Sequence, residues 1–360
     1  MATPKYQLLA AALQSEIEAG TLKEHEKLKT EKELMAEYAV SRQTVRHALA
    51  RLESDGFVRS RQGSGTFVTP RGRAVRSASR QIALVMTYIS DYIFPSIIRG
   101  IESVLSEQGY TLLLKATGNS VDQERAILQS LLESPPRALI VDGNKTVLPN
   151  PNLQYYRQFQ ALGIPIIFVH ATYPELTDIT KVAVDDRAGG HMAVDYLAQK
   201  GHTKIAAIFK STDFQGVQRY EGFIEGMIAN RLSFSDNHFI WFQDNDQMKL
   251  LLETDKTRRY FDGCTAIVCY NDQIAYLAVN YLTGLGYRVP QDISVISFDD
   301  SELAQYVRPR LTSFSHPKER LGVAAAESII KMIEGERVGS TIFPWEFSER
   351  DSVMDLTHPE

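Results

Sequence analysis

Residues 30–46 of this chain are TEKELMAEYAVSRQTVR, and this stretch decides the fold of the N-terminal part. Thr30 followed by Glu33 is a capping box, in which two side chains satisfy backbone N–H groups at a helix start. It predicts a helix over residues 31–38. Ser41 is a favourable N-cap for the next helix, after a turn of only a few residues. Two helices joined so closely are typical of a helix-turn-helix.

The second of these helices has an apolar and a polar face. Val45, Leu49 and Leu52 repeat with helical spacing and predict the buried face. The polar face lies at the helix N-terminus, the end that reaches base edges in DNA-bound helix-turn-helix proteins. Arg bonds guanine and Gln bonds adenine in bidentate fashion, whereas Ser and Thr suit phosphate oxygens. This polar face comprises Ser41, Arg42, Gln43, Thr44 and Arg46.

The helix pair is flanked by two further elements. Apolar residues at four-residue spacing predict an amphipathic helix over residues 6–19, ending at Gly20. The β-prone runs 57–60 and 66–69 surround a glycine-rich tip and predict a hairpin. With basic residues near its tip, this hairpin is expected to enter a minor groove as a wing.

Charge is divided unevenly along the chain. Residues 1–80 carry a net charge of +5, and the remainder carries −10. A basic segment attached to an acidic body indicates that only the first part meets a polyanion such as DNA.

Residues 4–69 resemble the winged-helix DNA-binding domain of GntR-type bacterial repressors. The stretches 28–34 (LKTEKEL), 40–46 (VSRQTVR) and 62–68 (QGSGTFV) carry the resemblance. The family often has Arg where Lys32 stands; Lys32 lacks the planar fork, so a phosphate contact is expected there. By position, the resemblance implies DNA contacts from Lys5, Lys32, Ser41, Arg42, Gln43, Thr44, Arg46, Gln62 and Gly63.

Beyond residue 70 the pattern changes. Residues 71–80 are polar, basic and aperiodic, which predicts a flexible linker. Apolar runs then alternate with helical patterns, which indicates parallel sheets with helices on both faces. The expected strands are 82–86, 138–141, 164–169, 205–209, 266–269 and 294–298, and the expected helices are 97–108, 121–132, 188–200, 219–229 and 273–285.

Polar and aromatic side chains follow most of these strands. Ligands bind at the carboxyl ends of strands in parallel sheets. Aromatic rings stack on sugar faces, while Asp, Asn and Arg hydrogen-bond paired hydroxyls. An Asp at a strand end is more often a helix cap than a ligand contact, but the joint placement predicts a cleft for a polyhydroxylated ligand. The side chains lie in residues 87–94, 142–145, 213–215, 270–272 and 299–300, together with His170 and Arg219.

Residues 81–360 resemble the effector-binding domain of LacI/GalR-type repressors, which are related to periplasmic sugar-binding proteins. This resemblance implies two α/β lobes joined by three strand crossings, which we expect near Gly201, Ser315 and Thr341. It is carried by residues 184–190, 200–205, 219–223, 289–300 and 316–322.

The combination of the two parts resembles the arabinose-responsive repressors of Gram-positive bacteria. Residues 144–145, 209–210, 215–217, 269–272 and 316–318 carry this closer resemblance. The family often has Gln where His316 stands. By position, the resemblance implies effector contacts from Tyr88, Asp91, Tyr92, Phe94, Lys145, His170, Arg219, Asn271, Asp299 and His316.

We therefore expect an α/β chain with a winged helix-turn-helix domain at residues 1–70, a linker at 71–80 and a two-lobed, periplasmic-binding-protein-like domain with parallel sheets at 81–360. The expected function is sequence-specific repression of sugar-utilisation genes, with release from operator DNA by a small sugar, first of all L-arabinose. A homodimer is expected, with the helix 97–108 and residues 277–281 in its interface.

Three other functions are alternatives to this one. A purine corepressor would use the same architecture but promote DNA binding instead of releasing it. A transport-type sugar-binding protein is disfavoured by the attached winged helix and the missing signal peptide. A sugar-processing enzyme is disfavoured because no nucleophile elbow, phosphate-binding loop or zinc-protease motif is present, and no catalytic residue is assigned.

Composition limits the remaining possibilities. Cys264 and Cys269 are the only cysteines, without a Cys/His cluster, so neither a disulfide scaffold nor a metal site is indicated, and no cofactor is expected. No apolar run approaches the 18 or so residues of a membrane span. The expected location is the cytoplasm.

Overall fold

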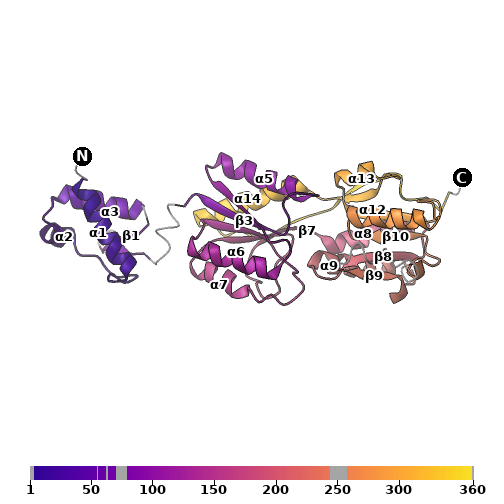
Figure 1. The fold of residues 1–360 in the computed structure, drawn as a ribbon, viewed down its shortest axis with the longest axis horizontal. Helices are drawn as coiled ribbons and strands as arrows, with labels where there is room; N and C mark the ends of the chain where they lie inside the picture. Colours follow the sequence, from indigo (N-terminus) through magenta and orange to yellow (C-terminus); the bar gives the residue numbers. More distant parts are fainter. Residues whose placement is uncertain (1–3, 55, 62–63, 70–78, 244–257, 359–360) are drawn as a thin grey trace.

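The computed structural model describes residues 4–54, 56–61, 64–69, 79–243 and 258–358. Its N-terminal part has the predicted winged helix-turn-helix fold (Figure 1). Thr30 Oγ1 accepts from the Glu33 N–H at 3.3 Å, and Glu33 Oε2 accepts from the Thr30 N–H at 2.7 Å, so the capping box is present. The elements are α1 (Lys5–Ala19), α2 (Glu31–Tyr38), α3 (Arg42–Ser54) and the antiparallel hairpin β1 (Val58–Arg61) and β2 (Gly65–Val68).

The core of this part is the expected one. Leu13, Leu34, Val45 and Leu52 are at most 2% exposed and pack together, while Leu49 is only partly buried against them. The apolar stripe of α3 is thus turned inward, and its polar face is left to solvent.

The first large lobe is built on a parallel sheet. Its strand order is β13-β7-β6-β5-β3-β4. Ile82 and Leu84 of β3 pack toward α5 and α14, and Ala83 and Val85 pack toward α6 and α7 on the other face (Figure 1). The elements are β3 (Gln81–Met86), α5 (Phe94–Glu107), β4 (Thr111–Ala116), α6 (Val121–Glu133), β5 (Ala138–Asp142), α7 (Leu153–Ala161), β6 (Ile166–Val169), β7 (Lys181–Val184), α14 (Lys318–Glu334) and β13 (Thr341–Phe343).

The second lobe repeats this layered plan. Its strand order is β14-β12-β11-β10-β8-β9, parallel except that β14 pairs antiparallel with β12. Helices α8 and α9 cover one face, and α12 covers the other. The elements are α8 (Asp186–Gln199), β8 (Ile205–Lys210), α9 (Phe214–Ala229), η1 (Asp236–His238), β9 (Phe239–Phe242), β10 (Ala266–Cys269), α12 (Asp272–Gly284), β11 (Ser294–Asp299), α13 (Glu302–Tyr306), β12 (Thr312–Ser315) and β14 (Glu346–Ser348).

Within the described residues, the chain passes between the lobes at three places, and two of them were predicted. The crossings between β12 and α14 and between β13 and β14 agree with the expected positions near Ser315 and Thr341. The expectation of a crossing near Gly201 is wrong, because the chain crosses between β7 and α8, at residues 184–186.

The physical reason lies in how α8 packs. Gly190 of α8 and Gly222 of α9 let the two helices touch backbone to backbone, since a Cβ on either would overlap a carbonyl oxygen of the other helix. Ala193 and Leu197 then join Phe223 in the core of the second lobe. The helix therefore follows the crossing instead of preceding it.

Two predictions from the sequence remain, one for a linker and one that no segment spans a membrane. Most of the predicted linker 71–80, namely residues 71–78, lies outside the residues that the structure describes. Among the residues it does include, we find no helix with the length and apolar character needed to cross a bilayer.

Candidate functional site

The side chains expected to read DNA gather around the start of α3. Ser41 Oγ accepts from the Thr44 N–H at 3.2 Å, so Ser41 caps the helix. Arg42 and Arg46 lie one turn apart on the exposed face. Arg42 Nε is 2.7 Å from Glu31 Oε2, and Arg46 Nε is 3.6 Å from Glu31 Oε1. One carboxylate of α2 thus holds both arginines.

The other expected DNA contacts are less closely grouped. Gln43 is exposed beside Arg42, while Lys5 and Lys32 are exposed in the first turns of α1 and α2. Gln62 and Gly63 lie outside the described residues. The described part of this surface is polar and accessible, which suits contacts to phosphates and base edges.

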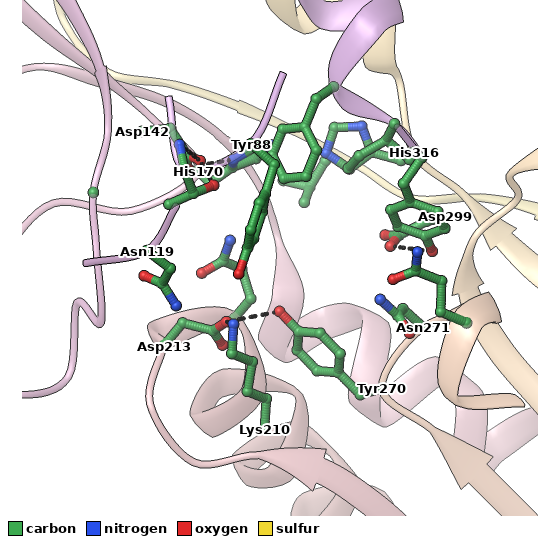
Figure 2. Close-up of a pocket in the computed structure, with 18 of the residues that line it drawn as sticks. Tyr88, Asn119, Asp142, His170, Lys210, Asp213, Tyr270, Asn271, Asp299 and His316 are labelled. Atoms are coloured by element: carbon green, nitrogen blue, oxygen red, sulfur yellow. Dashed lines mark hydrogen bonds and ion pairs between the residues drawn. The ribbon is translucent and has the colours of Figure 1, made fainter. Parts of the chain in front are cut away.

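A second candidate site lies between the lobes, at the carboxyl ends of their strands. It is a cavity of about 290 Å³. Its wall brings together all the side chains that the resemblance implied for the effector: Tyr88, Asp91, Tyr92, Phe94, Lys145, His170, Arg219, Asn271, Asp299 and His316. Figure 2 labels Tyr88, His170, Asn271, Asp299 and His316 among them.

Two buried histidines face each other at one side of the cavity. The rings of His170 and His316 are 5.4 Å apart between centroids and steeply inclined. His170 Nδ1 lies 3.0 Å from Asp142 Oδ1, and Asp142 Oδ2 accepts a hydrogen bond from the Thr87 N–H at 3.2 Å. His170 Nε2 and both ring nitrogens of His316 have no hydrogen-bond partner among the described residues. Three buried nitrogens of residues that line the cavity therefore have hydrogen-bonding capacity that the described residues do not use.

The two rings differ in their acid–base behaviour. Burial lowers the pKa of His316 well below its usual value, and the nearby His170, Lys318 and Arg219 lower it further. Burial opposes protonation of His170 as well, but Asp142, together with Asp186 and Asp299, outweighs it and raises the pKa of that ring. His316 is therefore neutral near pH 7 and offers one donor and one acceptor.

Arg219 is the centre of a buried ionic cluster. Its Nε donates to Asp186 Oδ1 at 2.8 Å, and its Nη2 is 3.6 Å from Asp299 Oδ1. Its Nη1 donates to the carbonyl oxygen of Tyr270, and the ring of Phe298 lies 4.5 Å from its Cζ. Burial raises the pKa of Asp186 to about 6, although Arg219 partly offsets this effect. The guanidinium thus fixes the position of Asp299 on the cavity wall.

Tyr92 connects the two lobes across the cavity. Its hydroxyl donates to Asp299 Oδ2 at 2.7 Å and accepts from the Asp272 N–H at 3.2 Å. Asp272 is itself held by the hydroxyls of Ser297, Ser301 and Ser313. The hydroxyl of Tyr92 is therefore engaged within the protein, and the residue acts here as a bridge between lobes.

Backbone strain gathers at the same place. Tyr92, Lys145, His170 and Asp299 have φ values of 61°, 44°, 65° and 94°, in the left-handed region that non-glycine residues rarely adopt. Such strain persists only where surrounding contacts enforce it, and it clusters at ligand sites.

Further residues line the cavity that were not among the expected effector contacts. Asp142 and Tyr270 directly follow predicted strands, and Asp213 and Gln215 lie in the expected polar segment 213–215 beyond another, so the strand-end pattern already included all four. Asn119 follows β4, which the sequence analysis did not predict. The further lining residues are Thr87, Ile93, Gly143, Val184, Lys210 and Gln273.

His316→Gln is expected to make stability less sensitive to acid. Because His316 resists protonation only when folded, the unfolded chain binds more protons below pH 6.5, and stability falls as pH drops through that range. Each pH unit below the unfolded pKa costs about 1.4 kcal/mol for such a group. Thermal melts at pH 7 and pH 5 should therefore show a smaller loss for the variant than for the wild type. An equal loss would contradict the buried neutral ring.

Comparisons with known proteins match each of the two parts of the chain to a protein family. Residues 5–68 match the model of the gntR family of bacterial regulatory proteins, and residues 194–353 match a periplasmic binding protein-like domain. A periplasmic binding protein/LacI transcriptional regulator from Alkaliphilus metalliredigens, crystallised with D-xylulofuranose, superposes with a TM-score of 0.67 at 28% identity, over 77% of this chain and 100% of that chain.

Relatives with similar sequences narrow the assignment to one family. The chain is 31% identical to the HTH-type transcriptional repressor PurR of Vibrio cholerae, over 78% of this chain and 83% of that one. It is 37% identical to the arabinose metabolism transcriptional repressor of Geobacillus stearothermophilus, over 98% of each chain. With this match nearly end to end, the chain, which joins a gntR-type domain to a periplasmic-binding-protein-like domain, belongs to the family of the arabinose metabolism transcriptional repressors.

Proposed function

We propose that this repressor controls sugar-utilisation genes and that L-arabinose, bound between the lobes, releases it from its operator. The observation that carries the proposal is the inter-lobe cavity, where unpartnered histidine nitrogens and an oriented carboxylate meet aromatic rings. Its volume of about 290 Å³ lies at the lower end of ligand pockets, so it suits one small molecule.

The chemistry of the wall supports a sugar. A pentose offers hydroxyls that both donate and accept, and each buried hydroxyl needs a partner. His316 supplies one donor and one acceptor, while Asp299 supplies an acceptor held in place by Arg219 and Tyr92. The ring of Tyr88 lies 5.7 Å from that of Phe94 and gives the cavity an aromatic side for a sugar face.

The choice of L-arabinose rests on the relative from Geobacillus stearothermophilus, whose name refers to arabinose metabolism. A different sugar, or a purine that promotes DNA binding, remains the contrasting outcome of the experiment below.

On the DNA side, we propose that Lys5, Lys32, Ser41, Arg42, Gln43, Thr44, Arg46, Gln62 and Gly63 contact the operator, within a domain of residues 1–70 joined by the linker 71–80 to residues 81–360. A homodimer, acting in the cytoplasm, would place two α3 helices in successive major-groove half-sites, so the operator should be roughly palindromic. Helices α5 and α12 are the proposed dimer faces; Tyr276 of α12 is 41% exposed.

Tyr92→Phe is expected to weaken binding of the sugar by about tenfold, without unfolding the chain. The variant keeps the ring but loses the bridge to Asp299 and Asp272, and a hydrogen bond to a charged group is worth about 1.5–3 kcal/mol. Isothermal titration with L-arabinose measures the change. Unaltered affinity would mean that the bridge does not help the lobes close on the ligand.

Thermal unfolding with candidate ligands tests the proposed function. L-arabinose at 100 times its Kd should stabilise the protein by about 2.7 kcal/mol, and D-xylose, D-ribose and D-glucose by less. Asp299→Asn should lose most of this response because its amide no longer accepts on both atoms. Stabilisation by another sugar would change the effector. Stabilisation by hypoxanthine or guanine alone would make the protein a purine-responsive repressor.

A further inference from the structure

The first lobe contains a buried carboxylate that is not among the residues lining the cavity. Glu124 of α6 is 1% exposed and accepts four hydrogen bonds, a full complement for two carboxylate oxygens. Its Oε1 accepts from the hydroxyls of Tyr156 at 2.6 Å and Tyr173 at 2.9 Å. Its Oε2 accepts from the side-chain amides of Asn150 at 2.9 Å and Asn152 at 2.7 Å. The function proposed above does not explain this network.

Tyr173 connects the carboxylate to the chain that forms the cavity wall. Its hydroxyl lies 2.9 Å from Glu124 Oε1, and the Asn144 N–H donates to it at 2.9 Å. The hydroxyl has a single proton, and a charged acceptor binds that proton more strongly than the Asn144 carbonyl oxygen, 3.0 Å away. The carboxylate therefore takes the proton, and the hydroxyl oxygen is left to accept from the Asn144 N–H.

Residues 144–147, which we call the wall segment, have two contacts that matter for a ligand. Lys145 lines the cavity and has a φ of 44°, a conformation that persists only where surrounding contacts enforce it. Thr146 Oγ1 accepts from the N–H of Phe214, in the second lobe, at 3.0 Å. The position of the Asn144 peptide therefore affects both the cavity wall and the contact between the lobes.

Stability alone does not account for the network. Buried hydrogen bonds contribute modestly compared with apolar packing of the same shape, whereas a fully satisfied network specifies one geometry. Asn144 is fixed at its side chain as well, because Thr117 Oγ1 donates to its Oδ1 at 2.6 Å. The arrangement is better explained by accurate placement of the wall segment.

We propose that Tyr173 is a positioning residue for the effector site. With its proton held by Glu124, its hydroxyl fixes the peptide of Asn144, and through it Lys145 beside the ligand and Thr146 against the second lobe. This inference rests on the proposed function, because it requires that the effector binds in the inter-lobe cavity.

Tyr173→Phe tests the inference in the full-length protein. The probe is whichever of L-arabinose, D-xylose, D-ribose, D-glucose, hypoxanthine and guanine stabilises the wild type most against thermal unfolding. The variant keeps the ring but leaves the Asn144 N–H buried without its acceptor, so affinity for the probe should fall by about tenfold. Isothermal titration measures the change, and unaltered affinity would overturn the proposal.

Tyr156→Phe is the matched control. Tyr156 and Tyr173 are both 0% exposed and donate to the same oxygen of Glu124. Within the described residues, however, no hydrogen bond joins Tyr156 to the wall segment, and three donors still hold Glu124 in the variant. Urea unfolding should show a similar loss of stability for both variants, while Tyr156→Phe keeps its affinity for the probe. An equal loss of affinity in both would mean that the lobe is loosened generally, and would overturn the positioning role.

Hydrogen exchange tests the same inference without a ligand. Peptides that span residues 143–148 should exchange faster in Tyr173→Phe than in the wild type or Tyr156→Phe. Equal exchange in all three would overturn the proposal. A wild type that binds none of the six probes would count against the proposed function, while exchange would still decide whether Tyr173 holds the wall segment.

Glu124→Gln tests how the hydroxyl is oriented. It should weaken binding of the probe, because an amide no longer accepts on both atoms and the hydroxyl of Tyr173 is free to turn toward the Asn144 carbonyl oxygen. Added to Tyr173→Phe, it should weaken binding no further. A further loss in the double variant would contradict the orienting role given to Glu124.

Discussion

Arg219→Ala is expected to destabilise the two-lobed part of the protein by about 3–5 kcal/mol. Arg219 is 3% exposed, and its removal leaves the carboxylates of Asp186 and Asp299 buried without their counter-ion. Both tryptophans, Trp241 and Trp345, belong to this part, so urea unfolding followed by tryptophan fluorescence reports on it alone. Response to the effector should be lost together with stability.

Arg187→Ala is the matched control. Arg187 also joins α8 to α9, through Glu225, but its side chain is 56% exposed. Water already solvates this pair, so the midpoint of unfolding should hardly move. Equal destabilisation by the two substitutions would contradict the importance assigned to the buried cluster.

Arg46→Ala is expected to weaken operator binding by about 1–3 kcal/mol, or roughly 5–150-fold, if Arg46 makes one bidentate base contact. Its side chain is 68% exposed and lies off the apolar stripe of α3, so the fold should be preserved. Gel-shift titration against operator and shuffled duplexes measures the effect, which should be far smaller for the shuffled duplex.

Lys32→Ala provides the contrast. If Lys32 meets phosphate, its removal should weaken binding to every duplex alike and lower the salt slope by about one unit. A uniform loss in Arg46→Ala as well would show that Arg46 does not read sequence.

The parts of the fold that could be predicted follow from strong local patterns. The capping box set the start of α2 at Glu31, and the alternation of apolar runs and helices gave the parallel sheets. The first crossing between the lobes, between β7 and α8, could not be located from the sequence. It depends on the close approach of α8 and α9, in which Gly190 packs against a helix distant in sequence. The six-residue strand β4 was not predicted, and the pocket residue Asn119, which follows it, was missed as well.

The cavity residues could be predicted to lie together, but not how they interact. Their position at strand ends and the family resemblance predicted that Tyr92, Arg219 and Asp299 line the same cavity. Neither indicates that the hydroxyl of Tyr92 is used to bridge the lobes, or that Arg219 is largely occupied by Asp186 and a carbonyl. These contacts depend on long-range geometry, and they give Arg219 a structural role beside the expected ligand role.

Titration of the full-length protein on its operator with L-arabinose tests the central claim most directly. Linkage requires that arabinose lower operator affinity by the same factor by which the operator lowers arabinose affinity. We predict that L-arabinose dissociates the complex at concentrations where D-xylose, D-ribose and D-glucose do not, and that Asp299→Asn stays bound. A complex that survives saturating L-arabinose, or one that forms only when a purine is added, would contradict the account.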